Sequence, residues 1–193
     1  MKRLYLTLIV LLLLADCKKD ITTATDHSAT TVKSEPTKTT TTAPVNQDTL
    51  ANSSFIKLAL VLDSLNSDET ALVFMKTANP DFNGNEDGQY LQGLGRENLA
   101  SIAPDGTKMA INTMPYTPNK PIRLYAYTKN DGSYLFKMTD ERTIPANLQV
   151  WVRDNLKKDS LNVRTGNYKF TVQKADTNTY GSNRFQLVLR AGH

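Results

Sequence analysis

Apolar and polar side chains alternate in short runs through most of the chain after residue 55. Successive side chains of a β-strand point to opposite faces, so a strand with one buried face shows this period of two. The runs cover residues 56–62, 71–75, 122–126, 148–152, 168–172 and 185–189. They are separated by turn residues and accompanied by few helix signals. The pattern predicts an all-β domain, an antiparallel β-sandwich of about eight to ten strands.

Turn signals divide these runs. Asp105-Gly106 and Asp131-Gly132 each stand between two of them and match the tight hairpin turns that need positive φ. Residues 79–97 lack the alternation and contain four glycines. This segment is therefore predicted to be a long loop, or a loop with one short helical turn. Long loops carry function more often than short ones.

The first residues indicate export from the cytoplasm. Basic Lys2-Arg3 is followed by an apolar run from Leu8 to Ala15, too short to cross a bilayer but suited to a secretory signal. Leu14-Ala15-Asp16-Cys17 resembles the lipobox of bacterial lipoproteins, which implies a signal peptide over 1–16 and an acylated Cys17. Cys17 is the only cysteine of the chain. The alternative is an ordinary secretory signal with an incidental cysteine.

The charges directly after this cysteine bear on location. Lys18-Lys19-Asp20 is similar to the charged start of many surface lipoproteins of the Bacteroidota. The similarity implies a lipid anchor in the outer membrane and display on the cell surface. The periplasmic face of that membrane is the alternative.

Threonine dominates residues 21–54, which contain no aromatic residue. Such a segment buries too little apolar surface to offset the entropy of ordering its backbone. We therefore predict a lipidated N-terminus and disordered stalk over 17–54 and the β-sandwich domain over 55–193. Asp48-Thr49-Leu50 resembles a short acceptor pattern for O-glycosylation in Bacteroidota, which makes Thr49 a candidate site. A plain linker is the alternative interpretation.

Charge and residue usage exclude several functions. The formal net charge is +4, and both signs are interspersed, so the chain lacks the concentrated basic patch of a nucleic-acid-binding protein.

Its two histidines, His27 and His193, lie in the stalk and at the last position. Without an interior histidine or cysteine, the domain lacks the residues for a serine triad, a cysteine-histidine pair or the usual zinc sites. Only carboxylate chemistry remains, and no glutamate stands in a recognisable acid/base motif. The domain glutamates are Glu69, Glu86, Glu97 and Glu141.

One loop pattern suggests calcium. Asp81, Asn83, Asn85 and Asp87 alternate within the glycine-containing segment and offer an oxygen ligand at every second position. Clustered carboxylate and amide oxygens hold hard cations such as Ca²⁺. Gln92 stands where a calcium loop has its bidentate glutamate, and a polar loop rich in turn-forming residues is the alternative. No other cofactor is expected.

Strand parity places several aromatic residues outside the core. If the apolar residues of 148–152 point inward, Trp151 points outward between Gln149 and Arg153. The same argument turns Tyr125 and Tyr127 outward. Exposed rings beside hydrogen-bonding groups suit a platform for sugars or for a partner protein. Alternatively, these rings pack under the long loop or pair along neighbouring strands.

The order of motifs along the domain resembles a β-sandwich module of large secreted Bacteroidota proteins. The motifs are residues 68–74, 87–90, 105–112, 132–134, 151–154, 168–170 and 183–185. This module is often appended near the C-terminus, beside sorting and adhesive regions, and no chemistry transfers with it. We expect a non-catalytic, lipid-anchored cell-surface binding or scaffolding module whose partner is a surface protein or a glycan. An accessory glycan-binding lipoprotein is the first alternative, and a carboxylate-dependent glycosidase is less favoured.

Overall fold

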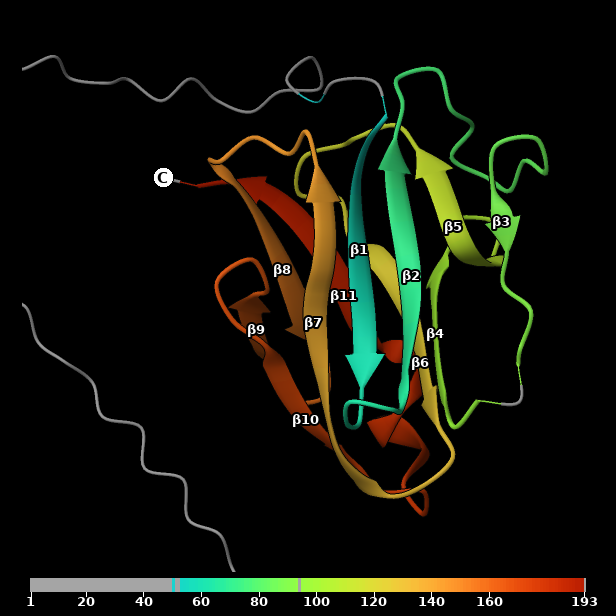
Figure 1. The fold of residues 1–193 in the computed structure, drawn as a ribbon, viewed down its shortest axis with the longest axis vertical. Helices are drawn as coiled ribbons and strands as arrows, with labels where there is room; N and C mark the ends of the chain where they lie inside the picture. The colour runs from blue at the N-terminus through green and yellow to red at the C-terminus, as the bar shows by residue number, and fades with distance from the viewer. Residues whose placement is uncertain (1–49, 51–52, 94, 193) are drawn as a thin grey trace, which may run out of the picture. The chain divides into compact units, whose positions relative to one another are not determined.

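The computed structural model describes residues 50, 53–93 and 95–192, and its regular structure consists of strands and one 3₁₀ turn (Figure 1). The elements are β1 Ser54–Val61, β2 Ser67–Phe74, β3 Gly88–Gln89, β4 Glu97–Ile102, β5 Lys108–Met114, β6 Ile122–Thr128, β7 Gly132–Arg142, β8 Leu148–Asp154, β9 Asp159–Asn162, β10 Tyr168–Val172, η1 Thr177–Thr179 and β11 Gly181–Ala191. The predicted all-β class is confirmed. The described residues contain no helix long and apolar enough to cross a membrane.

The strands form two layers. Their hydrogen-bonded order is β10-β7-β1-β2-β5-β4-β6-β11-β8-β9, with β3 added to β5. This sheet folds over itself, so that β7, β1 and β2 lie in front of β8, β11 and β6 (Figure 1). The sandwich therefore has eleven strands rather than eight to ten, and its layers are continuous through β5 and β4.

One strand pair is parallel, so the expectation of a wholly antiparallel sandwich needs correction. β5 begins as the hairpin partner of β4, through Ser101 opposite Met109 and Ile102 opposite Lys108. It then pairs in parallel with β2, from Ala71 opposite Ile111 to Phe74 opposite Met114. Parallel neighbours need a long connection, and the loop after β2 together with β3 and β4 supplies it.

The alternation in the sequence corresponds to the buried face of most strands. β2 is the exception, because Leu72 and Phe74 are buried, whereas Ala71 and Val73 on the expected face are only partly buried. In β8, Leu148, Val150 and Val152 are buried, whereas the residues between them are not. Aromatic rings join the two layers. The centroid of Phe185 in β11 lies 4.9 Å from that of Phe136 in β7 and 4.6 Å from that of Phe170 in β10.

The two Asp-Gly turns differ in what they connect. Asp105-Gly106 lies in the predicted β4–β5 hairpin, where Gly106 has a φ of 94°. The prediction for Asp131-Gly132 was wrong, because β6 and β7 do not pair with each other. Both edges of β6 are occupied, by β4 and β11, so this turn carries the chain into the other layer.

The folded unit includes residues before 55. β1 begins at Ser54, whose hydroxyl donates a hydrogen bond to the carbonyl oxygen of Thr143 at 3.1 Å. Leu50 is 4% exposed and belongs to the core. The predicted signal peptide, Cys17, Thr49 and most of the predicted stalk lie outside the described residues.

A buried ion pair ties the strands together at one end of the core. Arg184 in β11 and Asp154 in β8 are 3% and 0% exposed, and their Nη2 and Oδ2 atoms lie 2.8 Å apart. Arg184 also donates to the carbonyl oxygens of Thr171 and Thr179. Tyr168 donates its hydroxyl hydrogen to Asp154. The two charges are therefore paired and hydrogen-bonded, which is what burial of charge requires.

Candidate binding surface

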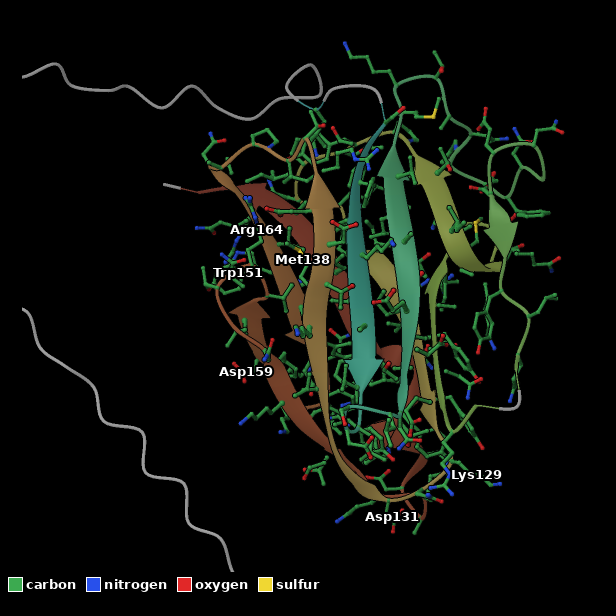
Figure 2. The ribbon with its side chains drawn as sticks, viewed as in Figure 1. Lys129, Asp131, Met138, Trp151, Asp159 and Arg164 are labelled. Atoms are coloured by element: carbon green, nitrogen blue, oxygen red, sulfur yellow. The ribbon has the colours of Figure 1, made fainter. Side chains whose placement is uncertain are left out.

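Trp151 lies on the outer face of β8, partly buried, while its neighbours Val150 and Val152 face the core. Figure 2 shows it at the edge of the molecule. Its indole Nε1 donates a hydrogen bond to Oε1 of Gln149 at 2.9 Å. The guanidinium carbon of Arg190 lies 3.9 Å from the ring centroid, within the range of a cation–π interaction. The ring is thus held by two neighbouring side chains.

Arg190 reaches Trp151 because of strand register. β11 pairs with β8 so that Arg190 stands opposite Gln149 and Gln186 stands opposite Arg153. Arg153 donates through Nη1 to Oε1 of Gln186 at 3.3 Å. We name the set Gln149, Trp151, Arg153, Gln186 and Arg190 the Trp151 surface.

Sequence reasoning missed Gln186 and Arg190. A signal for them exists, because the alternation of β11 buries Leu187 and Leu189 and leaves the residues between them outside. The alternation does not show that β8 is the strand next to β11, so it does not place these two residues beside Trp151. The Trp151 surface carries two guanidinium groups, two amide groups and one aromatic ring, and it contains no acidic residue. It is therefore suited to an acidic or polar partner.

Tyr125 and Tyr127 lie on the outer face of β6 and stack on each other, with ring centroids 6.4 Å apart and planes at 9°. Tyr90 from the long loop packs against Tyr125, and Tyr180 packs against Tyr127. We name these four residues the tyrosine row. The structure therefore agrees with the alternative in which the two β6 rings pack under the long loop and against neighbouring rings.

Lysines cover the tyrosine row. The Nζ atom of Lys108 lies 3.5 Å from the centroid of Tyr125, and that of Lys174 lies 4.0 Å from Tyr127 and 3.5 Å from Tyr180. These ammonium groups occupy ring faces that a sugar would need. The row thus offers less open aromatic surface than the sequence suggests.

A hydrogen bond fixes one end of the row. The Tyr90 hydroxyl donates to Oδ1 of Asn98 at 2.6 Å. Burial, together with the nearby Asp68 carboxylate and Tyr125, raises the pKa of the Tyr90 hydroxyl to about 12. The hydroxyl therefore stays protonated and keeps donating at neutral pH.

The Trp151 surface and the tyrosine row are separate. Arg123, Gln186 and Arg153 stand in one row across β6, β11 and β8. β6 and β8 run in the same direction, because both are antiparallel to β11. Tyr125 comes two residues after Arg123, whereas Trp151 comes two residues before Arg153. Their positions therefore lie on opposite sides of this row. At ~3.3 Å per residue and ~4.8 Å per strand, the Cα atoms of Tyr125 and Trp151 lie roughly 16 Å apart. These two residues do not form one platform for a small sugar.

The four predicted calcium ligands lie in the loop before β3. Both oxygens of Asp87 accept backbone hydrogen bonds, Oδ2 from the N–H of Asn83 at 2.8 Å and Oδ1 from that of Thr113 at 2.7 Å. Oδ1 of Asn83 accepts from the N–H of Asn85 at 3.1 Å, and Asp81 is exposed. In the described part of the chain, no three His, Cys, Asp or Glu side chains are grouped to hold a metal ion. Asp87 thus connects the loop to β5, and calcium binding stays a prediction.

Asp87→Ala is expected to destabilise the protein by about 1–3 kcal/mol in metal-free buffer, because it leaves two backbone N–H groups without their acceptor. Urea denaturation measures the change, and Asp81→Ala is the matched control from the same loop. Calcium that binds the native state raises its melting temperature by mass action. A stability loss seen only in the presence of calcium would contradict the metal-independent role of Asp87.

The glutamates lie in different surroundings. Glu97 is buried at the start of β4, whereas Glu69, Glu86 and Glu141 are exposed. Burial raises the pKa of the Glu97 carboxyl group, and its Oε1 has no hydrogen-bond partner among the described residues. Glu141 accepts a hydrogen bond from Arg164 at 2.8 Å.

Comparison with known proteins adds no family to this description. No family model matches the chain, and no curated protein and no solved structure matches it.

Proposed function

We propose that this protein is a non-catalytic binding module, held by an acylated Cys17 on the outer membrane of a bacterium of the Bacteroidota and displayed on the cell surface. The resemblance of residues 14–17 to a lipobox and of residues 18–20 to the start of surface lipoproteins supports the location. The Trp151 surface is the observation that carries the binding role.

Preorganisation is the reason why this surface favours binding. The hydrogen bond to Gln149 and the contact with Arg190 hold the indole before any partner arrives. Binding of a partner then costs little conformational entropy in these side chains. Tryptophan and arginine are also the residue types that most often dominate binding energy at interfaces.

The partner class follows from charge. Arg153 and Arg190 are exposed, so an acidic surface of another protein suits the Trp151 surface. An acidic glycan is the second candidate, because amide and guanidinium groups that hydrogen-bond sugars flank the indole. Arg190 lies over the ring, which reduces the open aromatic area that a neutral sugar needs.

Trp151→Ala is expected to weaken binding to the partner at least about tenfold, equivalent to ~1.4 kcal/mol. The domain should stay folded, because Trp151 lies on the outer face of β8 and the core side chains of Val150 and Val152 are unchanged. Binding is measured with immobilised acidic glycans and with purified outer-membrane proteins, and folding is measured by thermal denaturation.

Phe55→Ala is the matched control. Phe55 is also a partly buried aromatic residue, and the guanidinium carbon of Arg142 lies 5.1 Å from its ring, but it belongs to β1 in the other layer. This variant should bind as the native protein does. Equal binding by the Trp151 and Phe55 variants would refute the role of the Trp151 surface.

A further inference from the structure

A pocket with a volume of about 270 Å³ lies where β2, β4 and β5 end and β6 begins. The start of β5 pairs with the end of β4, and the rest of β5 pairs with β2. The pocket is lined mainly by apolar side chains, among them Phe74, Ile102, Met114, Tyr116, Ile122 and Leu189.

Prolines stiffen the walls of this pocket. Pro80, Pro104, Pro115 and Pro121 all line it, and each comes from a loop next to a strand end. Proline has a fixed φ and no backbone N–H, so these segments move little and present no unpaired donor. The pocket is therefore largely formed before a ligand enters, as small-molecule sites usually are.

Tyr116 supplies a polar group without a partner. The residue is 5% exposed and lines the pocket, and its hydroxyl has no hydrogen-bond partner among the described residues. Burial raises the pKa of this hydroxyl, so it stays protonated and is able to donate. Buried polar groups in native proteins are nearly always paired. The hydroxyl oxygen is itself shielded from solvent, so a ligand in the pocket becomes its acceptor only when the Tyr116 side chain turns toward it.

Positive charge borders the same pocket. Lys120 and Arg123 line it and are exposed, and none of the described lining residues is acidic. Asp105 follows the lining residue Pro104, but its carboxylate accepts hydrogen bonds from the backbone N–H groups of Phe82 and Thr107. A negatively charged ligand group thus meets two cations at the rim.

We propose that this pocket binds a small molecule with an apolar body and one carboxylate group. The apolar body fills the space between Phe74, Met114 and Leu189. The carboxylate lies near Lys120 and Arg123, and the Tyr116 side chain turns toward the pocket to donate to it. The volume equals that of roughly nine waters at about 30 Å³ each, which matches a phenyl ring with a short chain. This site shares no residue with the Trp151 surface, although Arg123 stands opposite Gln186.

The test uses 3-phenylpropionate as the probe and neutral 3-phenylpropionamide as its matched control. Calorimetric titration of the purified protein should give a Kd of about 1 mM or lower for the carboxylate and at least tenfold weaker binding for the amide, a difference of ~1.4 kcal/mol. Equal affinities, or no binding of either compound, would overturn the proposal.

Two sets of variants locate the ligand. Tyr116→Phe should weaken the carboxylate about tenfold without lowering the melting temperature, because it removes a hydroxyl that has no partner. Lys120→Gln combined with Arg123→Gln should abolish the preference for carboxylate over amide. Lys129→Gln should preserve this preference, since Lys129 lies beyond the far end of β6 (Figure 2). Unchanged binding by the Tyr116 variant would refute the role of the hydroxyl in binding, and a lower melting temperature would show that the hydroxyl serves the fold instead.

Discussion

Arg184→Met is expected to lower the free energy of unfolding by about 3–5 kcal/mol, the cost of leaving one member of a buried ion pair without the other. That loss is a large part of the ~5–15 kcal/mol that stabilises a typical domain. Arg184 bonds both carboxylate oxygens of Asp154 and two backbone carbonyl oxygens. The methionine side chain replaces the volume but none of these hydrogen bonds.

The other partners of Asp154 do not compensate for the missing guanidinium. The N–H groups of Leu156 and Lys157 and the hydroxyl of Tyr168 still donate to its carboxylate. A full negative charge nevertheless stays in the core with no countercharge. Urea denaturation measures the loss, and Arg190→Met is the matched control because Arg190 is an exposed arginine of the same strand. A loss of similar size in both variants would contradict a special role for the buried pair.

The same ion pair predicts acid sensitivity. Burial alone would raise the pKa of Asp154, but hydrogen bonds and the charge of Arg184 outweigh it and hold this pKa below the ordinary 3.8. Because the folded pKa is lower than the unfolded one, the ionised group stabilises the fold fully above pH 3.8. This stability is lost as the pH falls through the folded pKa. Arg184→Met should reduce that dependence, which denaturation midpoints at a series of acidic pH values measure.

Cys17→Ser is expected to move the protein completely from the membrane fraction to the soluble fraction. Acyl chains contribute about 0.8 kcal/mol per buried CH₂ to membrane binding, so loss of acylation removes most of the anchoring free energy. The chain has no second cysteine to take over this role. Fractionation of cells and detection of the protein in detergent-free washes measure the change.

Thr22→Ala is the control for this experiment, because it alters a nearby residue that has no part in the lipobox resemblance. It should leave the protein in the membrane fraction. A serine variant that stays with the outer membrane would favour an ordinary secretory signal and a different mode of attachment. The binding role of the Trp151 surface is tested separately and does not depend on this result.

Local alternation was enough to predict which side chains face the core in most strands, but not in β2. There the sequence suggested one face of Ala71, Val73 and Met75, whereas the structure buries Leu72 and Phe74. Val150 and Val152 are buried and Trp151 is on the outer face because successive residues of a strand point to opposite sides. The Asp105-Gly106 hairpin was likewise predictable, since it depends on residues adjacent in the chain. The all-β class and the outward position of Trp151 thus follow from the amino-acid sequence by itself.

Strand partners and register came only from the tertiary structure, because they depend on contacts between residues far apart in the chain. No local pattern places Arg190 over Trp151 or pairs Arg184 with Asp154, which is 30 residues away. The passage of β5 from β4 to β2 is also nonlocal, and it places Phe74 of β2 beside Met114 of β5 at the wall of the pocket near Tyr116. Alternation specifies the face of each strand, whereas packing of the whole core selects which strands become neighbours.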